Sequence, residues 1–100
     1  MFVGTARAVL QLFETSSLKD KRRVVRSVLD RVRNRFRTSV AEVEEQDNHN
    51  LAVLGVAFIS SNRILVEKLL REIESWIAAN AEAELLQFQT EIMKFRGGEE

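Results

Sequence analysis

The segment from Lys19 to Arg37 carries most of the positive charge of this 100-residue chain, and phosphate binding is the chemistry that such side chains suit best. The whole chain has 15 basic and 15 acidic residues, but nine basic residues fall in this segment against only Asp20 and Asp30. The segment is therefore at +7 and the rest of the chain at −7. Seven of the nine are arginines, whose guanidinium groups can contact a phosphate through two N–H groups at once.

A helix over residues 17–36 must position these charges. Its apolar residues recur at spacings of three and four: Leu18, Val25, Val28, Leu29, Val32 and Phe36. Ser17 followed by Asp20 fits a capping box, in which the hydroxyl and the carboxylate each bind a free backbone N–H at the start of the helix. At about 100° per residue, one flank of this helix gathers six cations. The candidate phosphate-binding residues are Lys19, Arg22, Arg23, Arg26, Arg33 and Arg37.

Such a flank has a cost, because like charges four residues apart on a helix repel each other. The second predicted helix shows the usual solution, with complementary Glu67–Arg71 and Lys68–Glu72 pairs. The imbalance in the first helix favours a polyanion partner, either RNA or a ribosomal subunit. The alternative is a solvated face or a surface for intermolecular salt bridges. No aromatic residue interleaves with the basic flank, so stacking of single-stranded bases on this helix is not expected.

Other polar residues are weaker candidates for a site. Lys21 lies at the edge of the apolar arc, and we expect its ammonium group to reach past the core into solvent. His49 is the only histidine and lies in a turn, which is a poor basis for a metal site. Glu42 and Glu44 are expected on one strand face, and Trp76 on the core face of the second helix. The sequence lacks the usual means of catalysis, so we predict a protein that is not an enzyme and takes no cofactor or metal.

The elements around the basic helix follow the order β-α-β-β-α-β. Residues 2–13, 39–45, 51–59 and 85–95 read as strands. Ser60, Ser61 and Asn62 each offer an N-cap for a second helix, which runs to about Ala79. This order predicts an α+β, ferredoxin-like split β-α-β fold, with a four-stranded antiparallel sheet and two helices on one face. We expect a single domain over 1–96 and a flexible tail over 97–100.

Composition limits where the protein acts. The chain has no cysteine, which excludes disulfides and thiolate metal sites and fits a reducing compartment. Its first residues lack a basic region before an apolar run, and no stretch approaches 18 apolar residues, so we expect neither a signal peptide nor a membrane span. The expected location is the cytoplasm.

A second class of function is a homo-oligomeric module that binds no nucleic acid. The uncovered face of the predicted sheet would offer Val3, Val9 and Val40, and the outer strands 39–45 and 85–95 could pair with another chain to form a homodimer.

A third class is a small-molecule domain. It needs a pocket between sheet and helices or at a dimer seam, and the sequence shows no polar cluster suited to one, so no small-molecule substrate is identified.

Four blocks of sequence carry a resemblance to a known family. They are Ser17-Leu18-Lys19-Asp20-Lys21-Arg22-Arg23, Arg33-Asn34-Arg35-Phe36, Ser39-Val40-Ala41-Glu42-Val43 and Gln46-Asp47. With them the chain resembles, over nearly its whole length, the YlxP-like family of small bacterial proteins, a family of unknown function. The resemblance implies a ferredoxin-like fold, a bacterial cytoplasmic protein, and genes often beside those of translation and ribosome-maturation factors. Where that family often has a bulky apolar residue after the Gln-Asp pair, this chain has Asn48-His49.

Overall fold

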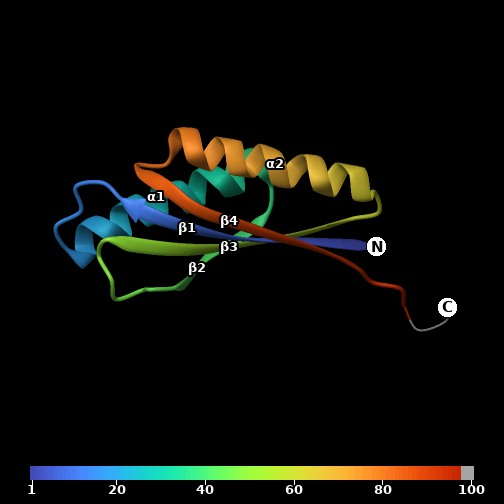
Figure 1. Ribbon diagram of the computed structural model, residues 1–100, viewed down its shortest axis with the longest axis horizontal. Helices are drawn as coiled ribbons and strands as arrows, with labels where there is room; N and C mark the ends of the chain where they lie inside the picture. Colours follow the sequence, from blue (N-terminus) through green and yellow to red (C-terminus); the bar gives the residue numbers. More distant parts are fainter. Residues whose placement is uncertain (98–100) are drawn as a thin grey trace.

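The computed structural model describes residues 1–97, and two helices and four strands follow one another in the predicted order (Figure 1). The elements are β1 (Phe2–Leu12), α1 (Leu18–Phe36), β2 (Ser39–Glu44), β3 (Leu51–Ser60), α2 (Arg63–Asn80) and β4 (Ala83–Lys94). Of the predicted tail over 97–100, all but Gly97 lies outside the described residues.

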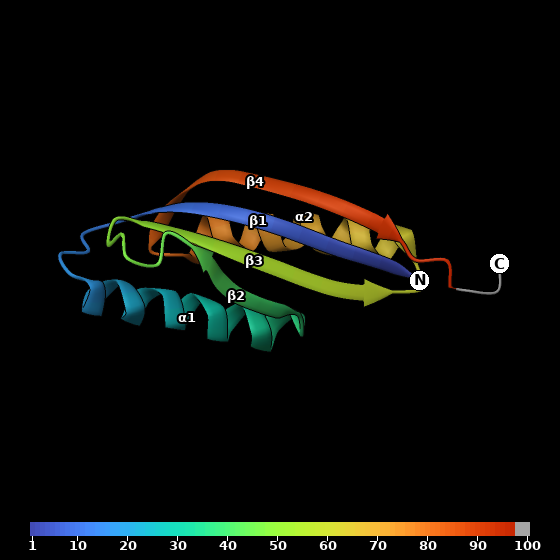
Figure 2. The ribbon, with the colours of Figure 1, turned by 90° about the horizontal axis from the view of Figure 1, so that it is seen from below.

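The four strands form one antiparallel sheet in the order β2-β3-β1-β4, which confirms the predicted fold. Both helices lie on the same side of the sheet. In Figure 2, α1 runs along the β2 side and α2 lies behind β1. The opposite face of the sheet carries no helix and is called the open face below. β2 and β4 are the two edges.

The core lies between the sheet and the helices. In β1 the side chains of Ala6, Ala8, Leu10 and Leu12 are buried and alternate with half-buried residues of the open face. This is the period-two pattern of a strand covered on one face. At Gly4 the helix α2 comes especially close, since a Cβ built there would lie 2.6 Å from Val66 Cγ1. Only a glycine fits this contact without movement of the Val66 side chain or of α2.

Both helices begin at a polar cap. Ser17 Oγ accepts a hydrogen bond from the backbone N–H of Asp20, and Asn62 Oδ1 accepts one from that of Leu65. The Asp20 carboxylate reaches back to the N–H and hydroxyl of Ser16, at 3.4 and 2.8 Å. The predicted capping box is therefore confirmed, with the carboxylate bound one residue before the cap.

The prediction that Glu42 and Glu44 share a strand face was wrong. A bulge in β2 shifts the register between these residues, so that Glu42 pairs with Leu54 and Glu44 with Val53. A bulge adds one residue to a strand and so reverses which face the next side chains occupy. Glu42 therefore faces the helices, and Glu44 lies on the open face with Arg7.

Two smaller expectations also need correction. Val40 belongs to the buried core rather than to the open face. The carboxylate of Glu67 pairs with Arg63, at 3.7 Å, instead of Arg71. The expected Lys68–Glu72 pair is present at 3.9 Å. Within residues 1–97, neither helix is long and apolar enough to cross a membrane.

Candidate nucleic-acid interface

The outward face of α1 carries the six candidate residues, here called the basic stripe: Lys19, Arg22, Arg23, Arg26, Arg33 and Arg37. All six are exposed. The buried residues of the helix, including Val24, Val28 and Val32, lie on its other side. At a rise of 1.5 Å per residue, the stripe is about 27 Å long. The helix therefore presents a row of cations to solvent along its whole length.

Most of the basic stripe is free of acidic partners. Within residues 1–97, Lys19, Arg22, Arg26 and Arg37 have no carboxylate oxygen within 4 Å. Arg23 shares a shallow hollow with Glu14 and Glu82 but also forms no ion pair there. These cations are available to an anion from outside the chain.

Arg33 is the member of the stripe that the fold itself uses. Its guanidinium lies 3.3 Å from Asp30 Oδ1 and donates a 2.9 Å hydrogen bond to the backbone oxygen of Val40 in β2. Arg37 ends the helix in a left-handed conformation with φ 53°, and its backbone N–H donates to Arg33 O. The end of the stripe is therefore tied to the adjacent sheet edge.

Asp20 places one negative charge at the start of the stripe. Hydrogen bonds from Ser16 hold the pKa of the Asp20 carboxyl below its ordinary value, and the nearby charges of Arg23 and Lys19 lower it further. This carboxylate is occupied by the helix cap. It does not form an ion pair with a stripe residue within the described chain.

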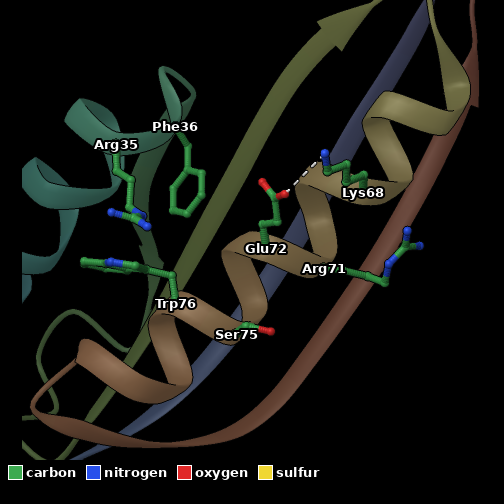
Figure 3. Close-up of a pocket in the computed structure, with 7 residues that line it drawn as sticks. All are labelled: Arg35, Phe36, Lys68, Arg71, Glu72, Ser75 and Trp76. Carbon is green, nitrogen blue, oxygen red and sulfur yellow. Dashed lines mark ion pairs between the residues drawn. The ribbon is translucent and has the colours of Figure 1, made fainter.

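A second cationic region lies in the shallow groove between α1 and α2 (Figure 3). The groove measures about 590 Å³ and is lined by Arg35, Phe36, Lys68, Arg71, Glu72, Ser75 and Trp76. Trp76 is half-buried and meets Phe36 edge to face, with ring centroids 6.2 Å apart. The Arg31 guanidinium lies 5.2 Å from the centre of the Trp76 ring. Trp76, which the sequence predicts on the core face of the second helix, thus lies at the edge of the core with arginines around it, and no local sequence pattern indicates those arginines.

Lys21 is buried, with 1% of its surface exposed, so the expectation that it reaches into solvent was wrong. Its ammonium group lies 2.9 Å from Glu42 Oε2 and donates hydrogen bonds to the backbone oxygens of Glu45 and Asn48. Glu42 Oε2 has no aligned hydrogen-bond donor, so its contact with Lys21 is an ion pair. Two of the three N–H donors of the lysine are therefore used by backbone oxygens, and the Glu42 carboxylate balances its charge. Lys21 therefore fastens the β2–β3 turn to α1.

The sequence held a signal for this arrangement. Lys21 precedes Val25, Val28 and Val32 by four, seven and eleven residues, which is the spacing of the buried side of a helix. Its acidic partner, Glu42, lies on a strand with a bulge, and the alternation of residues in the sequence does not show where such a bulge occurs.

His49 lies in the turn that Lys21 holds. Its backbone oxygen accepts a 2.6 Å hydrogen bond from the Thr15 hydroxyl. Residues Glu45 to His49 line a shallow polar hollow at this turn. Among residues 1–97, no group of three or more acidic or histidine side chains is arranged to hold a metal ion.

The open face of the sheet is bridged by Arg7. Its guanidinium spans β3 at Gly55, the residue paired with it, and lies 2.6 Å from Glu44 Oε1 on β2. Arg7 also reaches Gln87 and Gln89 on β4, both at 3.4 Å. The hydrogen bond and the charge of Arg7 lower the pKa of the Glu44 carboxyl. Arg7, although positive, is thus already paired.

This arrangement of strands and helices defines a ferredoxin-like protein. It is similar to the solution NMR structure of a de novo designed protein with a ferredoxin fold, with a TM-score of 0.50 and 11% identity, covering 97% of this chain and 88% of that one. Residues 3–90 match the family described as "Protein of unknown function (DUF503)", and the chain belongs to this family. It is 34% identical over 89 residues to the "Uncharacterized protein YlxP" of Bacillus subtilis (strain 168), covering 89% of this chain and 97% of the relative.

The family membership confirms the resemblance found in the sequence, and the structure shows how its blocks come together. Lys21 belongs to the first block, Glu42 to the third, and Gln46 to the fourth. Lys21 and Glu42 form the buried ion pair, and the Gln46 side chain donates to the backbone oxygen of Glu42. These blocks therefore build the junction of α1, β2 and the following turn.

Proposed function

We propose that this protein is a non-enzymatic accessory protein of the cytoplasm that binds structured RNA, in a ribosomal subunit or its precursor, through the basic stripe. The observation that carries the proposal is the set of exposed cations without carboxylate partners along the outward face of α1. Four of them, Lys19, Arg22, Arg26 and Arg37, have no carboxylate oxygen within 4 Å in the described residues.

The position of the charges supports this proposal over a solvated face. Cations in the last turn of a helix are stabilised by its dipole, but Lys19 lies in the first turn, where the dipole disfavours it, and Arg22 and Arg26 lie too far from the C-terminus to gain from it. Arg22 and Arg26 also repel each other at a spacing of four. This spacing of cations does not stabilise the helix, but it suits the binding of a chain of phosphates.

The stripe favours recognition of the RNA backbone rather than of its bases. Its members are lysines and arginines that contact phosphate oxygens, and such contacts carry no sequence information by themselves. A straight rigid helix with a row of charges suits the folded, duplex-rich surface of ribosomal RNA, which proteins recognise mainly by shape and backbone contacts.

The test is binding of a fluorescent RNA hairpin, followed by anisotropy at several salt concentrations. If four phosphates are neutralised, log K should fall against log salt with a slope of about −3 to −4. The double variant R22E/R26E should bind at least tenfold more weakly at low salt, and its slope should be shallower by about 2. Co-sedimentation with ribosomal subunits should weaken in parallel.

The matched control is R63E/K68E, which changes the net charge by the same amount on α2. Both residues are exposed, and each pairs with an acid on its own helix. This control should retain most of the binding. Equal losses of RNA affinity in the two double variants would mean that net charge, and not the basic stripe, determines binding. If the wild type shows no salt-sensitive binding of RNA, the proposal is wrong.

A further inference from the structure

The two edges of the sheet differ in a way that points to a partner. At β2 the outward-facing backbone oxygens are occupied, because Arg33 donates to Val40 O and Gln46 donates to Glu42 O. β2 is also short, with six residues, and carries a bulge. These are the usual means by which proteins block an edge strand.

At β4 the edge is open. Phe95 donates its backbone N–H to Met1 O, and the antiparallel register then directs Gln87, Gln89, Glu91 and Met93 toward β1. In such a ladder the bonding direction alternates from residue to residue. The N–H and C=O groups of Phe88, Thr90, Ile92 and Lys94 therefore face outward. Within residues 1–97 none of these groups has a partner.

We propose that a second copy of this chain pairs with β4 through its own β4, forming a homodimer with one continuous eight-stranded sheet. Antiparallel pairing of identical strands is what a two-fold axis produces, and it offers each outward group a matching group on the copy. This inference is independent of RNA binding. Of the two outer strands that the sequence left as candidates, β4 is the one whose outward N–H and C=O groups are all without partners in the described chain, whereas the outward oxygens of Val40 and Glu42 in β2 are occupied.

The residues of β4 select one register. A two-fold axis at Glu91 would place two carboxylates opposite each other, which is unfavourable. An axis at Gln89 would run the pairing into Leu86, where the register of β4 with β1 shifts. An axis at Thr90 keeps the carboxylates apart and moves the irregular residue to the end of the pairing, where Leu86 would lie opposite Lys94 of the partner subunit. It pairs Thr90 with Thr90 of the partner subunit, and Phe88 with Ile92 of the partner subunit.

The side chains beside this edge suit a copy of themselves. Phe88, Thr90 and Ile92 line a shallow groove against α2, together with Leu70 and Arg71. Phe88 and Ile92 are only half-buried in the single chain, and pairing would cover them. Arg71 points toward β4 and away from Glu72 in Figure 3, and it has no carboxylate within 4 Å in the described chain. Glu67 and Glu74 line the same groove, so two copies offer complementary charges.

A cysteine substitution tests the register directly, because the natural chain has no cysteine. In a hydrogen-bonded antiparallel pair the Cα atoms are about 5.5 Å apart, within the range that a disulfide spans. T90C should therefore form a disulfide dimer under mild oxidation. Q87C is the matched control on the same strand. Its two copies would lie six residues apart, about 20 Å, and should not form a disulfide.

Two separate proline variants test whether the free edge of β4 forms the dimer. Their mass is measured by sedimentation equilibrium from micromolar to millimolar protein concentration, without RNA. The wild type should approach twice its monomer mass of 11.5 kDa. T90P removes an outward N–H, so it should remain folded and become monomeric. Q89P removes an N–H directed at β1 and should lose stability instead. A wild type that stays monomeric at millimolar concentration, with no disulfide in T90C, would overturn the proposal and leave the edge to a strand of another protein.

Discussion

The two helices pack on the same face of one sheet and have nearly equal lengths, 19 and 18 residues, yet they treat charge in opposite ways. On α2, Arg63 and Lys68 each have an acid four residues later. On α1, five of the six stripe cations form no ion pair within residues 1–97, and the sixth is Arg33. On α2 only Arg71 of its three cations has no carboxylate within 4 Å in the described chain, whereas on α1 the unpaired cations form a row, and this difference is the basis of the proposal that the stripe acts outside the fold.

The comparison also separates the cations of α1 from one another. Lys21 is buried and paired, Arg31 lies on Trp76, and Arg33 is bonded to β2. These three hold the helix in place. The remaining cations of the stripe can be changed with little effect on the fold, and this difference is what the following experiments measure.

The largest effect is expected at Lys21. Lys21→Ala would leave Glu42 partly buried without its ion pair, and would free two backbone oxygens in the turn. We expect the free energy of unfolding to fall by about 3 to 5 kcal/mol. Urea denaturation followed by the fluorescence of Trp76, the single tryptophan, measures this.

The control for this change is Lys19→Ala, two residues away and exposed, which should alter stability by no more than about 0.5 kcal/mol. Similar losses in the two variants would mean that the buried lysine is no more important than an exposed one.

The next largest loss of stability is expected where β1 packs closely against α2 at Gly4. Gly4→Ala would place a Cβ 2.6 Å from Val66 Cγ1 and 3.1 Å from Phe58 Cζ, so the Val66 side chain or α2 must shift. We expect a loss of about 1 to 3 kcal/mol in thermal or chemical denaturation. Gly55→Ala is the comparison, since its Cβ would meet only the half-exposed side chain of Val43 at 3.0 Å, which can move. A cost at Gly55 equal to that at Gly4 would contradict this view.

A smaller change in stability, of opposite sign on the two helices, tests whether α1 is unbalanced in charge and α2 is balanced. Arg22→Glu creates attractive spacings with Lys19 and Arg26, so α1 should gain a few tenths of a kcal/mol. Lys68→Glu breaks the pair with Glu72 and places two acids four residues apart, so α2 should lose about the same amount. Denaturation midpoints at low salt measure both. If both variants lost stability, the stripe would be contributing to the fold.

The smallest effect is a change of pKa on the open face. Arg7→Gln removes the hydrogen bond and the charge that lower the pKa of Glu44, so this pKa should rise toward the ordinary glutamate value of about 4.3. A lowered folded-state pKa gives stability above the unfolded pKa, and this stability is lost as the pH falls through the folded value. The pH dependence near pH 4 should therefore weaken in the variant.

An NMR titration of the carboxyl carbons measures this pKa. The pKa of Asp20 serves as the control, because hydrogen bonds from Ser16 lower it, and it should move in Ser16→Ala but not in Arg7→Gln. Movement of both carboxyls in Arg7→Gln would indicate a general loss of structure.

Local patterns were enough to predict the fold and the basic stripe. The alternation in β1, the apolar spacing in α1 and the cap at Ser17 each depend on residues a few positions apart, which a sequence displays directly. The sequence also predicts which cations share the outward side of α1, because helix geometry alone decides that. The family resemblance adds the same fold and, in agreement with the comparisons, no established activity.

Only the tertiary structure decided which charges are used by the fold and which are free. The partners of Lys21, Arg33 and Arg7 lie 21, 7 and 37 residues away in the sequence. A one-residue bulge in β2 separates Glu42, which pairs with Lys21 on the helix side of the sheet, from Glu44, which pairs with Arg7 on the open face. The state of the two sheet edges also depends on side chains from other elements. Pairing between distant segments depends on register, and register is a property of the folded sheet rather than of any local stretch of sequence.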